Sequence, residues 1–419
     1  MTAPTKMKRG SLLRIYLAGS YLFPLVAGRI LRKRLSKGKE HPTRWTEKQG
    51  RNLAPRPKGQ LVWLHAVGLG ETLSLRGLIA RMAAKQPELS FLVTSTTRAS
   101  AQVFAQNLPP RTIHQFLPID APLYRRRFLD HFEPDLCIWA EQDIWPGFVS
   151  DLAQRDIPQA IIAARLADKS FKAHQRAKSL YRDLYQAMKL VTAQDATTAT
   201  HLGQFGVEAA ITGSLKPAAP ALSHSEAELS QLRAQIAGRF TWVVAPSHPR
   251  DEVIACKAHE LLLRQLPDAL LIIAPRDPKR PEEADPNIPR KSKSQHPKAD
   301  DPVWLCDTYG DLGLIYRLTD AALIGGTFTD VEGHNPWEAA ALNTAILHGP
   351  RYGNFTSDFA QLHASNAAIS VKTPEDIANA LLNADLADLA ARASTVVEKA
   401  SLSTDQLALD LLGLLRTPK

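Results

Sequence analysis

Short apolar runs that alternate with longer amphipathic stretches constrain the fold of this 419-residue chain most strongly. The first series of expected strands is Leu61–Leu64, Phe91–Thr94, Leu136–Trp139, Gln159–Ile162, Leu190–Ala193 and Ala209–Thr212. The amphipathic stretches between them include Leu73–Lys85, Tyr124–His131, Phe148–Gln154 and Phe171–Ala187. Strands that alternate with helices form βαβ units, so the pattern predicts an α/β chain with a parallel sheet.

A second series of runs repeats the pattern and predicts a second domain of the same kind. Its expected strands are Trp242–Ala245, Leu270–Ala274, Val303–Leu305, Ala322–Ile324 and Ala345–Leu347. Lys216–Ser225 has the composition of an interdomain linker. The polar, Pro-rich segment Arg276–Asp301 is expected to be a mobile surface loop, and the chain from Asp376 onward to be helical. We therefore expect an N-terminal segment at 1–50, a first domain at 51–217 and a second at 218–419.

The positive charge of the chain is confined to the N-terminal segment. Of the 51 Lys and Arg residues, 13 lie within residues 1–51, beside only 2 Asp or Glu, although the chain as a whole has 42 acidic residues. The rest of the chain is close to neutral, which is not how a nucleic-acid-binding domain is built. The 3 cysteines are far apart and have no CxxC spacing, so neither a zinc site nor a redox dithiol is indicated.

The same segment contains an apolar stretch, Ile15–Gly28, flanked by Lys and Arg on both sides. It is shorter than the roughly 20 residues that a membrane-spanning helix needs. A signal peptide is one alternative, but positive charge directly behind an apolar run favours the cytoplasmic side. We expect a helix that lies on the membrane, with its basic groups on anionic headgroups. The other alternative is a helix that only packs on the protein.

Ligands of open α/β sheets bind beyond the carboxyl ends of the strands, so candidate site residues are sought there. In the stretch HAVGLGET, Glu71 follows the first strand at the mouth of a helix. It is a candidate proton acceptor, or a first-turn acid that complements the helix dipole. Glu141 and Asp143 follow the strand at 136–139 in AEQDIWP. Asp143 suits a helix N-cap, whereas Glu141 has no such structural role and is the stronger candidate.

Lys216, in ITGSLKPA, follows the last strand of the first series and is expected either to neutralise an anion or to be a solvated linker lysine. In the second half, Arg276 can bind a phosphate or carboxylate with its planar guanidinium. Gly325 and Gly326 allow the backbone to approach a ligand, and Glu338 lies one turn into a helix where it can bind sugar hydroxyls. His65, His248 and His334 lack the spacing of a metal motif, so no metal site is expected.

Taken together, the motifs make the chain resemble the 3-deoxy-D-manno-octulosonic acid (Kdo) transferases of lipopolysaccharide synthesis. The resemblance rests on RWTEKQG, WLHAVGLGET, AEQDIWP, TGSLK, APRDP, DTYGDL, GGTF, GHNPWEAAA and GPRYGNF, in the family's order. It implies the GT-B glycosyltransferase fold, with two Rossmann-like domains facing a central cleft and an N-terminal membrane-associated helix.

The resemblance also implies an inverting, metal-independent reaction without a cofactor. It implies CMP-Kdo as the donor, a lipid A precursor as the acceptor, and a place on the cytoplasmic face of the inner membrane. By matching motifs, Glu71 is the expected base, and Glu141 and Lys216 stabilise the transition state. The expected contacts of the donor nucleotide are Pro275, Arg276, Tyr309, Gly310, Asp311, Asn335, Pro336, Trp337 and Glu338.

The chain departs from the family pattern at two places. Pro246, Arg250 and Asp251, in PSHPRDE, are unusual, and Asp143 replaces a second glutamate. Both departures lie near expected site residues. They leave open a paralogue that uses another sugar donor, an epimerase, and a non-catalytic relative that binds lipid or a partner.

Overall fold

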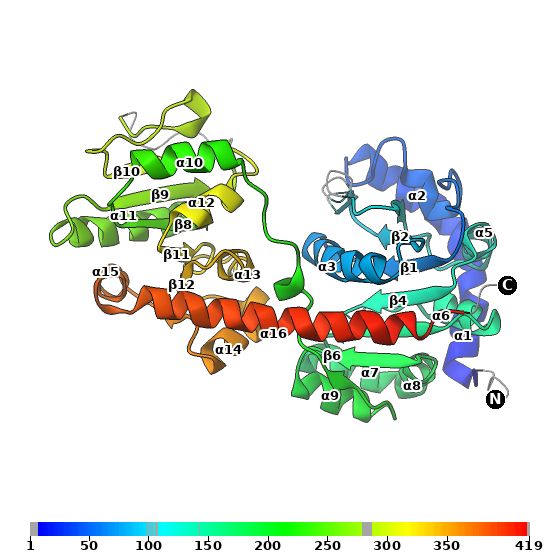
Figure 1. Cartoon of the computed structure of the whole chain (residues 1–419). Coiled ribbons are helices and arrows are strands. Elements are labelled where there is room, and N and C mark those ends of the chain that lie inside the picture. Colours follow the sequence, from blue (N-terminus) through cyan, green and yellow to red (C-terminus); the bar gives the residue numbers. More distant parts are fainter. Residues whose placement is uncertain are drawn as a thin grey trace. The chain divides into compact units, whose positions relative to one another are not determined.

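The computed structural model describes residues 7–98, 100–101, 104, 108–141, 143–278 and 287–416. It divides into two compact units, the first comprising Met1–Ala219 with Ala400–Lys419 and the second Pro220–Lys399. Each unit contains one parallel sheet flanked by helices (Figure 1). The predicted α/β fold class is confirmed.

The strands of the first sheet are β1 (Leu61–His65), β2 (Ser90–Ser95), β3 (Thr112–Phe116), β4 (Leu136–Ala140), β5 (Gln159–Ala164), β6 (Leu190–Ala193) and β7 (Ala210–Ile211). Those of the second sheet are β8 (Thr241–Ser247), β9 (Leu270–Pro275), β10 (Val303–Leu305), β11 (Ala321–Ile324), β12 (Ala345–His348) and β13 (Ile369–Ser370).

The helices of the first unit are α1 (Ser11–Gly19), η1 (Ser20–Leu22), α2 (Phe23–Ser36), η2 (Trp45–Gln49), α3 (Leu69–Lys85), α5 (Pro122–Phe132), α6 (Pro146–Gln154), α7 (Asp168–Arg176), α8 (Lys178–Gln186), α9 (Ala196–Gly203) and η3 (Lys216–Ala218). Those that follow are α10 (Glu226–Gln235), α11 (Pro249–Leu263), η4 (Lys291–Lys293), α12 (Leu312–Leu318), α13 (Trp337–Ala340), η5 (Gly353–Phe355), α14 (Thr356–Ala364), α15 (Pro374–Asn383) and α16 (Leu386–Leu412).

The two sheets share one topology. The order is β3-β2-β1-β4-β5-β6-β7 in the first and β10-β9-β8-β11-β12-β13 in the second, with every pairing parallel. Successive residues of a strand face opposite sides, and both sides are covered by helices, so the central strands are apolar throughout. In β1, Trp63 packs with α5 and α6, while Val62 and Leu64 pack with α3.

The predicted strands are present, and the structure adds two that the sequence pattern did not reveal. β3 was missed because His114 and Gln115 interrupt its apolar run; both side chains are buried and hydrogen-bonded, to Ser95 and to the Ala54 amide. β13 has only two residues. The single helix expected over Phe171–Ala187 is two helices, because the backbone leaves the helical region at Ala177.

The expected surface loop over Arg276–Asp301 is exposed over most of residues 287–301, but it is anchored to the rest of the second unit. Arg290 is buried and bridges to Leu305 of β10, and Lys291 forms ion pairs with Glu228 and Asp311, each at 2.7 Å. These contacts hold the polar segment against the second sheet. Residues 279–286 lie outside the described residues.

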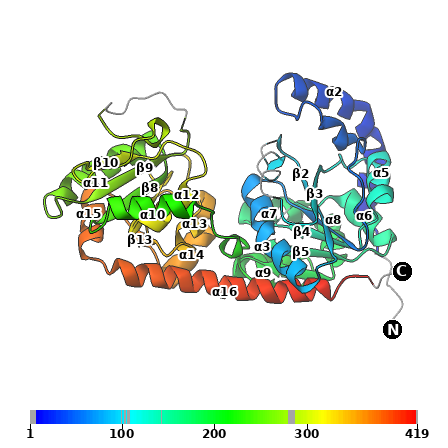
Figure 2. The same cartoon turned by 45° about the horizontal axis from the view of Figure 1, so that its top comes forward.

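The C-terminal end of the chain returns to the first unit. Residues of α16 beyond Ala400 pack on the first sheet, where Leu407, Ala408 and Leu411 are buried beside α3 (Figure 2). The second structural unit therefore ends at residue 399, before the end of the expected domain at 218–419.

The N-terminal helices form one segment, Ser11–Ser36, that is long and apolar enough to cross a membrane by length and composition. Its inner side is fixed to the first unit: Tyr16 donates a hydrogen bond of 2.7 Å to Asp120, and Ala27 packs on Tyr124 of α5. Only 17% of its most apolar stretch is buried. The exposed apolar side chains of the segment are Leu12, Ile15, Tyr21, Leu22, Leu25, Val26 and Ile30.

Candidate active site

Glu71 lies at the third position of α3, directly after the turn that follows β1. Its Oε2 accepts hydrogen bonds of 3.1 Å from the amides of both Val67 and Gly68. The side chain therefore caps the helix, as the structural alternative expected, and the cap also fixes where the carboxylate points. Among the described residues, Oε1 accepts no hydrogen bond.

Glu141 follows β4, the strand that pairs with β1, so it lies at the same sheet edge as Glu71. It has a left-handed backbone (φ 62°), which few non-glycine residues adopt. Its amide donates to Ile162 of β5 at 3.0 Å and so holds the turn in place. Strained residues of this kind concentrate at functional sites, so the backbone supports Glu141 as a site residue.

Asp143 does not cap α6, so that expectation is wrong. Its Oδ2 instead accepts hydrogen bonds from His65 Nε2 at 3.1 Å and from the Trp145 indole at 2.9 Å. Burial opposes its charged form, yet the hydrogen bond and charge interaction with His65 and the Trp145 bond outweigh burial and lower the pKa of Asp143. The carboxylate is thus kept ionised beside Glu141.

A chain of buried hydrogen bonds behind this edge orients the ring of His65. The Trp63 indole donates to Thr94 Oγ1 at 2.9 Å, and that hydroxyl lies 2.8 Å from His65 Nδ1. The Nε2 atom of His65 faces Asp143, and it carries a proton both in the imidazolium and in the neutral tautomer whose Nδ1 accepts from Thr94. His65 is therefore a structural donor, in keeping with its lack of a metal motif.

The N-terminus of α6 is capped by Asp120, a residue that the sequence reading did not identify. Its two carboxylate oxygens accept from the amides of Gly147 and Phe148 at 2.8 and 3.1 Å, and it pairs with Arg125 at 3.3 Å. The same carboxylate accepts a hydrogen bond from the Tyr16 hydroxyl. One buried acid thus connects the N-terminal helix to the helix that follows the Glu141 turn.

Lys216 begins η3, just beyond β7. Its amide donates to Ser214 Oγ at 3.2 Å, and the side chain is half-buried. It thus belongs to the first unit.

In the second unit, the predicted donor contacts follow neighbouring strands and so share one sheet edge. Arg276 follows β9, with its amide bonded to Ser247 of β8 at 2.9 Å and its side chain exposed. Tyr309, Gly310 and Asp311 follow β10, where Gly310 has a φ of 95° and Lys291 binds Asp311. Pro275 is the last residue of β9.

The loop after β11 carries the GHNPWE motif into α13. Asn335 donates to Glu338 at 3.3 Å and accepts the amide of Trp337 at 3.2 Å, while the Trp337 indole donates to Asp358 at 2.6 Å. Pro336 directly precedes the helix. Burial raises the pKa of Glu338, against the opposing effects of Asn335 and Arg276.

Two histidines meet beside this loop. The Nε2 atoms of His248 and His334 lie 2.9 Å apart, with the rings nearly parallel. Burial, followed by the nearby His248 and Arg276, lowers the pKa of His334 to about 4. His334 is therefore neutral at physiological pH. Within the described part of the chain, no three His, Cys, Asp or Glu side chains gather as a group that could hold a metal ion.

Asp251, one of the residues that departs from the family pattern, fastens the GGTF loop. Its carboxylate accepts the amides of Gly326 at 2.7 Å, His248 at 3.0 Å and Phe328 at 3.2 Å. Gly325 is required here for close approach, because a Cβ at this position would lie 1.9 Å from the Pro246 carbonyl oxygen. Two of the unusual residues of PSHPRDE, Pro246 and Asp251, thus contact the GGTF loop directly.

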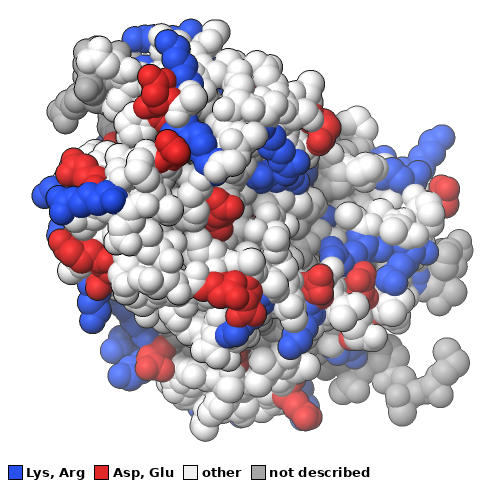
Figure 3. All heavy atoms as spheres, turned by 60° about the vertical axis from the view of Figure 1, so that its left-hand side comes forward, with Lys and Arg blue, Asp and Glu red and all other residues white. Residues whose placement is uncertain are grey.

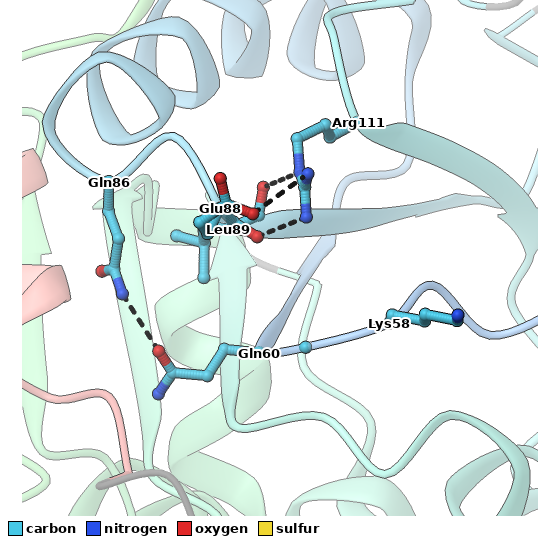
Figure 4. A pocket seen from close by; sticks show the side chains of 7 residues that line it. Lys58, Gln60, Gln86, Glu88, Leu89 and Arg111 are labelled. Carbon is cyan, nitrogen blue, oxygen red and sulfur yellow. Dashed lines mark hydrogen bonds and ion pairs between the residues drawn. The ribbon is translucent and has the colours of Figure 1, made fainter.

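A pocket of about 240 Å³ lies at the opposite, amino edge of the first sheet (Figure 4). Its Arg111 donates to the carbonyls of Glu88 and Leu89 at 2.5 and 3.2 Å, and Gln86 bonds to Gln60 at 3.0 Å. Four polar side chains of this pocket are thus engaged with neighbouring lining residues, namely Gln60, Gln86, Glu88 and Arg111. The predicted site residues all lie at the carboxyl ends of strands instead.

Charged side chains of both signs are interspersed over a mostly uncharged surface on the face shown in Figure 3. Nucleic-acid-binding domains instead carry a stripe or patch of positive charge.

Comparisons with known proteins agree with this geometry. Residues 43–219 match the family described as "3-Deoxy-D-manno-octulosonic-acid transferase (kdotransferase)". The 3-deoxy-D-manno-octulosonic acid transferase of Rickettsia felis is 32% identical over 76% of this chain and 70% of its own length.

Two solved structures share the fold at low sequence identity. The glycotransferase of kitacinnamycin superposes with a TM-score of 0.52 at 12% identity, covering 87% of this chain and 100% of that chain. The UDP-GlcNAc 2-epimerase of Neisseria meningitidis gives 0.52 at 13%, covering 84% and 99%. The fold is GT-B. The family match and the extent of the Rickettsia alignment show that the chain belongs to the 3-deoxy-D-manno-octulosonic acid (Kdo) transferase family.

Proposed function

We propose that the chain transfers Kdo from CMP-Kdo to a hydroxyl group of a lipid A precursor, with inversion at the anomeric carbon. The observation that carries this proposal is the held carboxylate of Glu71. One of its oxygens is anchored by two backbone amides and the other has no hydrogen-bond partner among the described residues. Such a group is suited to accept the proton of a bound hydroxyl.

In the proposed reaction, the acceptor oxygen attacks the anomeric carbon as the bond from that carbon to the CMP phosphate oxygen breaks. The hydroxyl proton passes to Glu71, and CMP leaves with the bonding electrons. Because the acceptor attacks directly, no covalent enzyme intermediate forms. Lys216 is proposed to neutralise developing negative charge, with Glu141 beside Glu71 stabilising the positive character of the sugar ring.

The donor is proposed to bind at the carboxyl edge of the second sheet. Its phosphate and the Kdo carboxylate are anions, which the exposed guanidinium of Arg276 can bind. Pro275, Tyr309, Gly310 and Asp311 are proposed to contact the nucleotide. A second set of donor contacts comes from the loop after β11, namely Asn335, Pro336, Trp337 and Glu338.

The departures from the family pattern do not require another donor. Asp251 binds backbone amides of the chain itself and so has a structural explanation. The fold alone is shared with an epimerase, but the apolar Ser11–Ser36 segment is a feature that an enzyme acting on a lipid needs. We propose that the reaction uses neither a metal ion nor another cofactor.

The N-terminal segment is proposed to lie on the cytoplasmic face of the inner membrane, where the acceptor is held. Its exposed side chains, such as Leu25 and Ile30, are apolar, and basic residues flank them. A pocket lined by Arg9, Tyr21 and Arg126 places cations beside this apolar surface. Apolar burial together with positive charge is the combination that binds anionic bilayers.

The test of the catalytic proposal compares the wild type with Glu71→Ala, using CMP-Kdo generated in the assay and a tetraacylated lipid A precursor. Loss of the base should lower kcat by about 10²–10⁴-fold. The matched control is Glu88→Gln, an exposed acid at the opposite sheet edge, which should transfer at the wild-type rate. Wild-type transfer by Glu71→Ala would refute the role of Glu71.

Membrane contact is tested separately by flotation with vesicles that contain phosphatidylglycerol. The double variant Leu25→Asp/Ile30→Asp should remain in the soluble fraction, because both side chains are exposed and the substitutions insert charge into the proposed contact. Leu402→Asp, an equally exposed leucine on α16, should still float. Equal flotation of all three proteins would contradict the proposal.

A further inference from the structure

Lys216 follows a strand that lies far across the sheet from Glu71. In the order β1-β4-β5-β6-β7, four strand spacings separate β7 from β1, or about 19 Å at the usual distance between strands. If the chain left β7 along the strand direction, Lys216 would remain at the far side of the sheet. The chain instead turns into η3, which packs on α3, the helix whose third residue is Glu71.

The packing of η3 on α3 depends on a glycine. A Cβ built on Gly77 would lie 2.2 Å from the carbonyl oxygen of Ala218 and 2.9 Å from its carbonyl carbon. Any larger side chain must therefore push the two segments apart. Leu215, directly before Lys216, is buried in the same apolar cluster as Leu75 and Leu78 of α3.

Arg81, one turn further along α3, stabilises the same packing of η3 on α3. Its Nη1 donates to the carbonyl of Gly77 at 3.0 Å and to that of Ala218 at 3.1 Å. Its Nη2 donates to Ser401 Oγ, and its Nε lies 3.3 Å from Asp405 of α16. A single guanidinium thus holds η3 and the returning C-terminal helix on one turn of α3.

We propose that Arg81 is a positioning residue of the transfer reaction, which with Gly77 fixes the segment of Lys216 on the helix that carries Glu71. This rests on the function proposed above for Lys216. Arg81 acts through the backbone of Ala218 and does not itself touch a substrate. Its planar fork is needed because one side chain must reach two carbonyls and a hydroxyl at once.

The first test measures kcat and the donor KM of Arg81→Gln and Gly77→Ala. Misplacing a catalytic group by about 1 Å can cost roughly 100-fold in rate, so kcat should fall by about 10- to 100-fold in both variants, with the donor KM unchanged. The controls are Arg392→Gln, from a half-exposed ion pair with Asp388, and Gly203→Ala, where a Cβ meets no atom within 4 Å. If Arg81→Gln does not fold, Gly77→Ala, which alters no charge, provides the same measurement.

The second test is a double-mutant cycle with Lys216→Met. If Arg81 acts through Lys216, Arg81→Gln should cause no further loss of kcat once the ammonium group is absent, because the two effects are coupled. Full additivity of the two losses would overturn the proposal, as would wild-type kcat in both Arg81→Gln and Gly77→Ala. Wild-type activity of Lys216→Met alone would instead refute the role of Lys216 in the proposed function, so the two failures are distinguishable.

Discussion

The two units have parallel sheets of the same order but stabilise their carboxyl-edge loops differently. In the first unit, buried Asp120 binds two amides at the start of α6 and is neutralised by Arg125. In the second, the carboxylate of buried Asp251 accepts hydrogen bonds from three backbone amides. Burial raises the pKa of both carboxyls. The same topology can therefore be held by an ion pair or by backbone dipoles.

This difference predicts how much stability each unit loses when Asp120 or Asp251 is replaced. Removing Asp120 leaves the buried guanidinium of Arg125 with Asp151, at 2.8 Å, as its remaining ion-pair partner, and it takes the acceptor away from two amides and the Tyr16 hydroxyl. Removing Asp251 leaves only neutral amides. Loss of an ion-pair partner together with hydrogen bonds costs more than loss of hydrogen bonds to amides alone. The first unit should therefore be the more sensitive of the two.

The largest effect is expected for Asp120→Ala. Loss of one of the two ion pairs of Arg125, together with the hydrogen bonds from Gly147, Phe148 and Tyr16, should lower the free energy of unfolding by about 3–5 kcal/mol, measured by denaturant titration. Asp130→Ala, which removes an exposed partner of Arg155, is the control and should change stability by about 0–1 kcal/mol. Equal effects of the two substitutions would mean that the Asp120 network is not a stabilising element.

A smaller effect is expected for Asp251→Asn. The amide group cannot accept all three backbone N–H donors, so the free energy of unfolding should fall by about 1–3 kcal/mol. Because the GGTF loop loses its anchor, the donor KM should rise as well. Asp388→Asn, on the surface of α16, serves as the control. An unchanged donor KM together with lower stability would show that the GGTF loop does not contribute to donor binding.

The third prediction concerns the stability of the protein at acid pH, which we expect to depend on a buried histidine of the second unit. His348 is fully buried and bonded to Gly349 and His363, and burial lowers its pKa to about 4. Between pH 6.5 and 4 the unfolded chain takes up a proton at this residue and the folded chain does not. Stability therefore falls as the pH falls through this window.

In His348→Gln, the loss of stability between pH 6.5 and pH 4 should be smaller by about 2–3 kcal/mol. The measurement is the unfolding midpoint in urea across this range, with the exposed His131→Gln as control. The same pH dependence in His348→Gln and wild type would show that another group controls the acid response.

Much of the fold was predictable because strands covered on both faces must be apolar along their whole length. The central strands β1, β4 and β8 were therefore visible in the sequence. β3 was not, since its His114 and Gln115 are buried through hydrogen bonds to distant residues. The two-residue β13 is too short to leave a pattern.

The candidate site was predictable to the extent that it depends on where strands end. That rule, with the family motifs, led to Glu71, Glu141 and Lys216. It could not lead to the roles of Asp120, Asp251 or Arg81, because each of them also binds a distant backbone group, 27, 75 and 137 residues away in the chain respectively. Backbone groups carry no residue identity, so no spacing in the sequence records such contacts.

The cap formed by Glu71 has a consequence for the timing of the proposed reaction. The oxygen that holds the Val67 and Gly68 amides belongs to the same carboxylate that would take the acceptor's proton. A protonated carboxyl group is a weaker acceptor than a carboxylate. Each turnover would therefore loosen this turn just after the new bond has formed, and deprotonation of Glu71 would tighten it again for the next substrate.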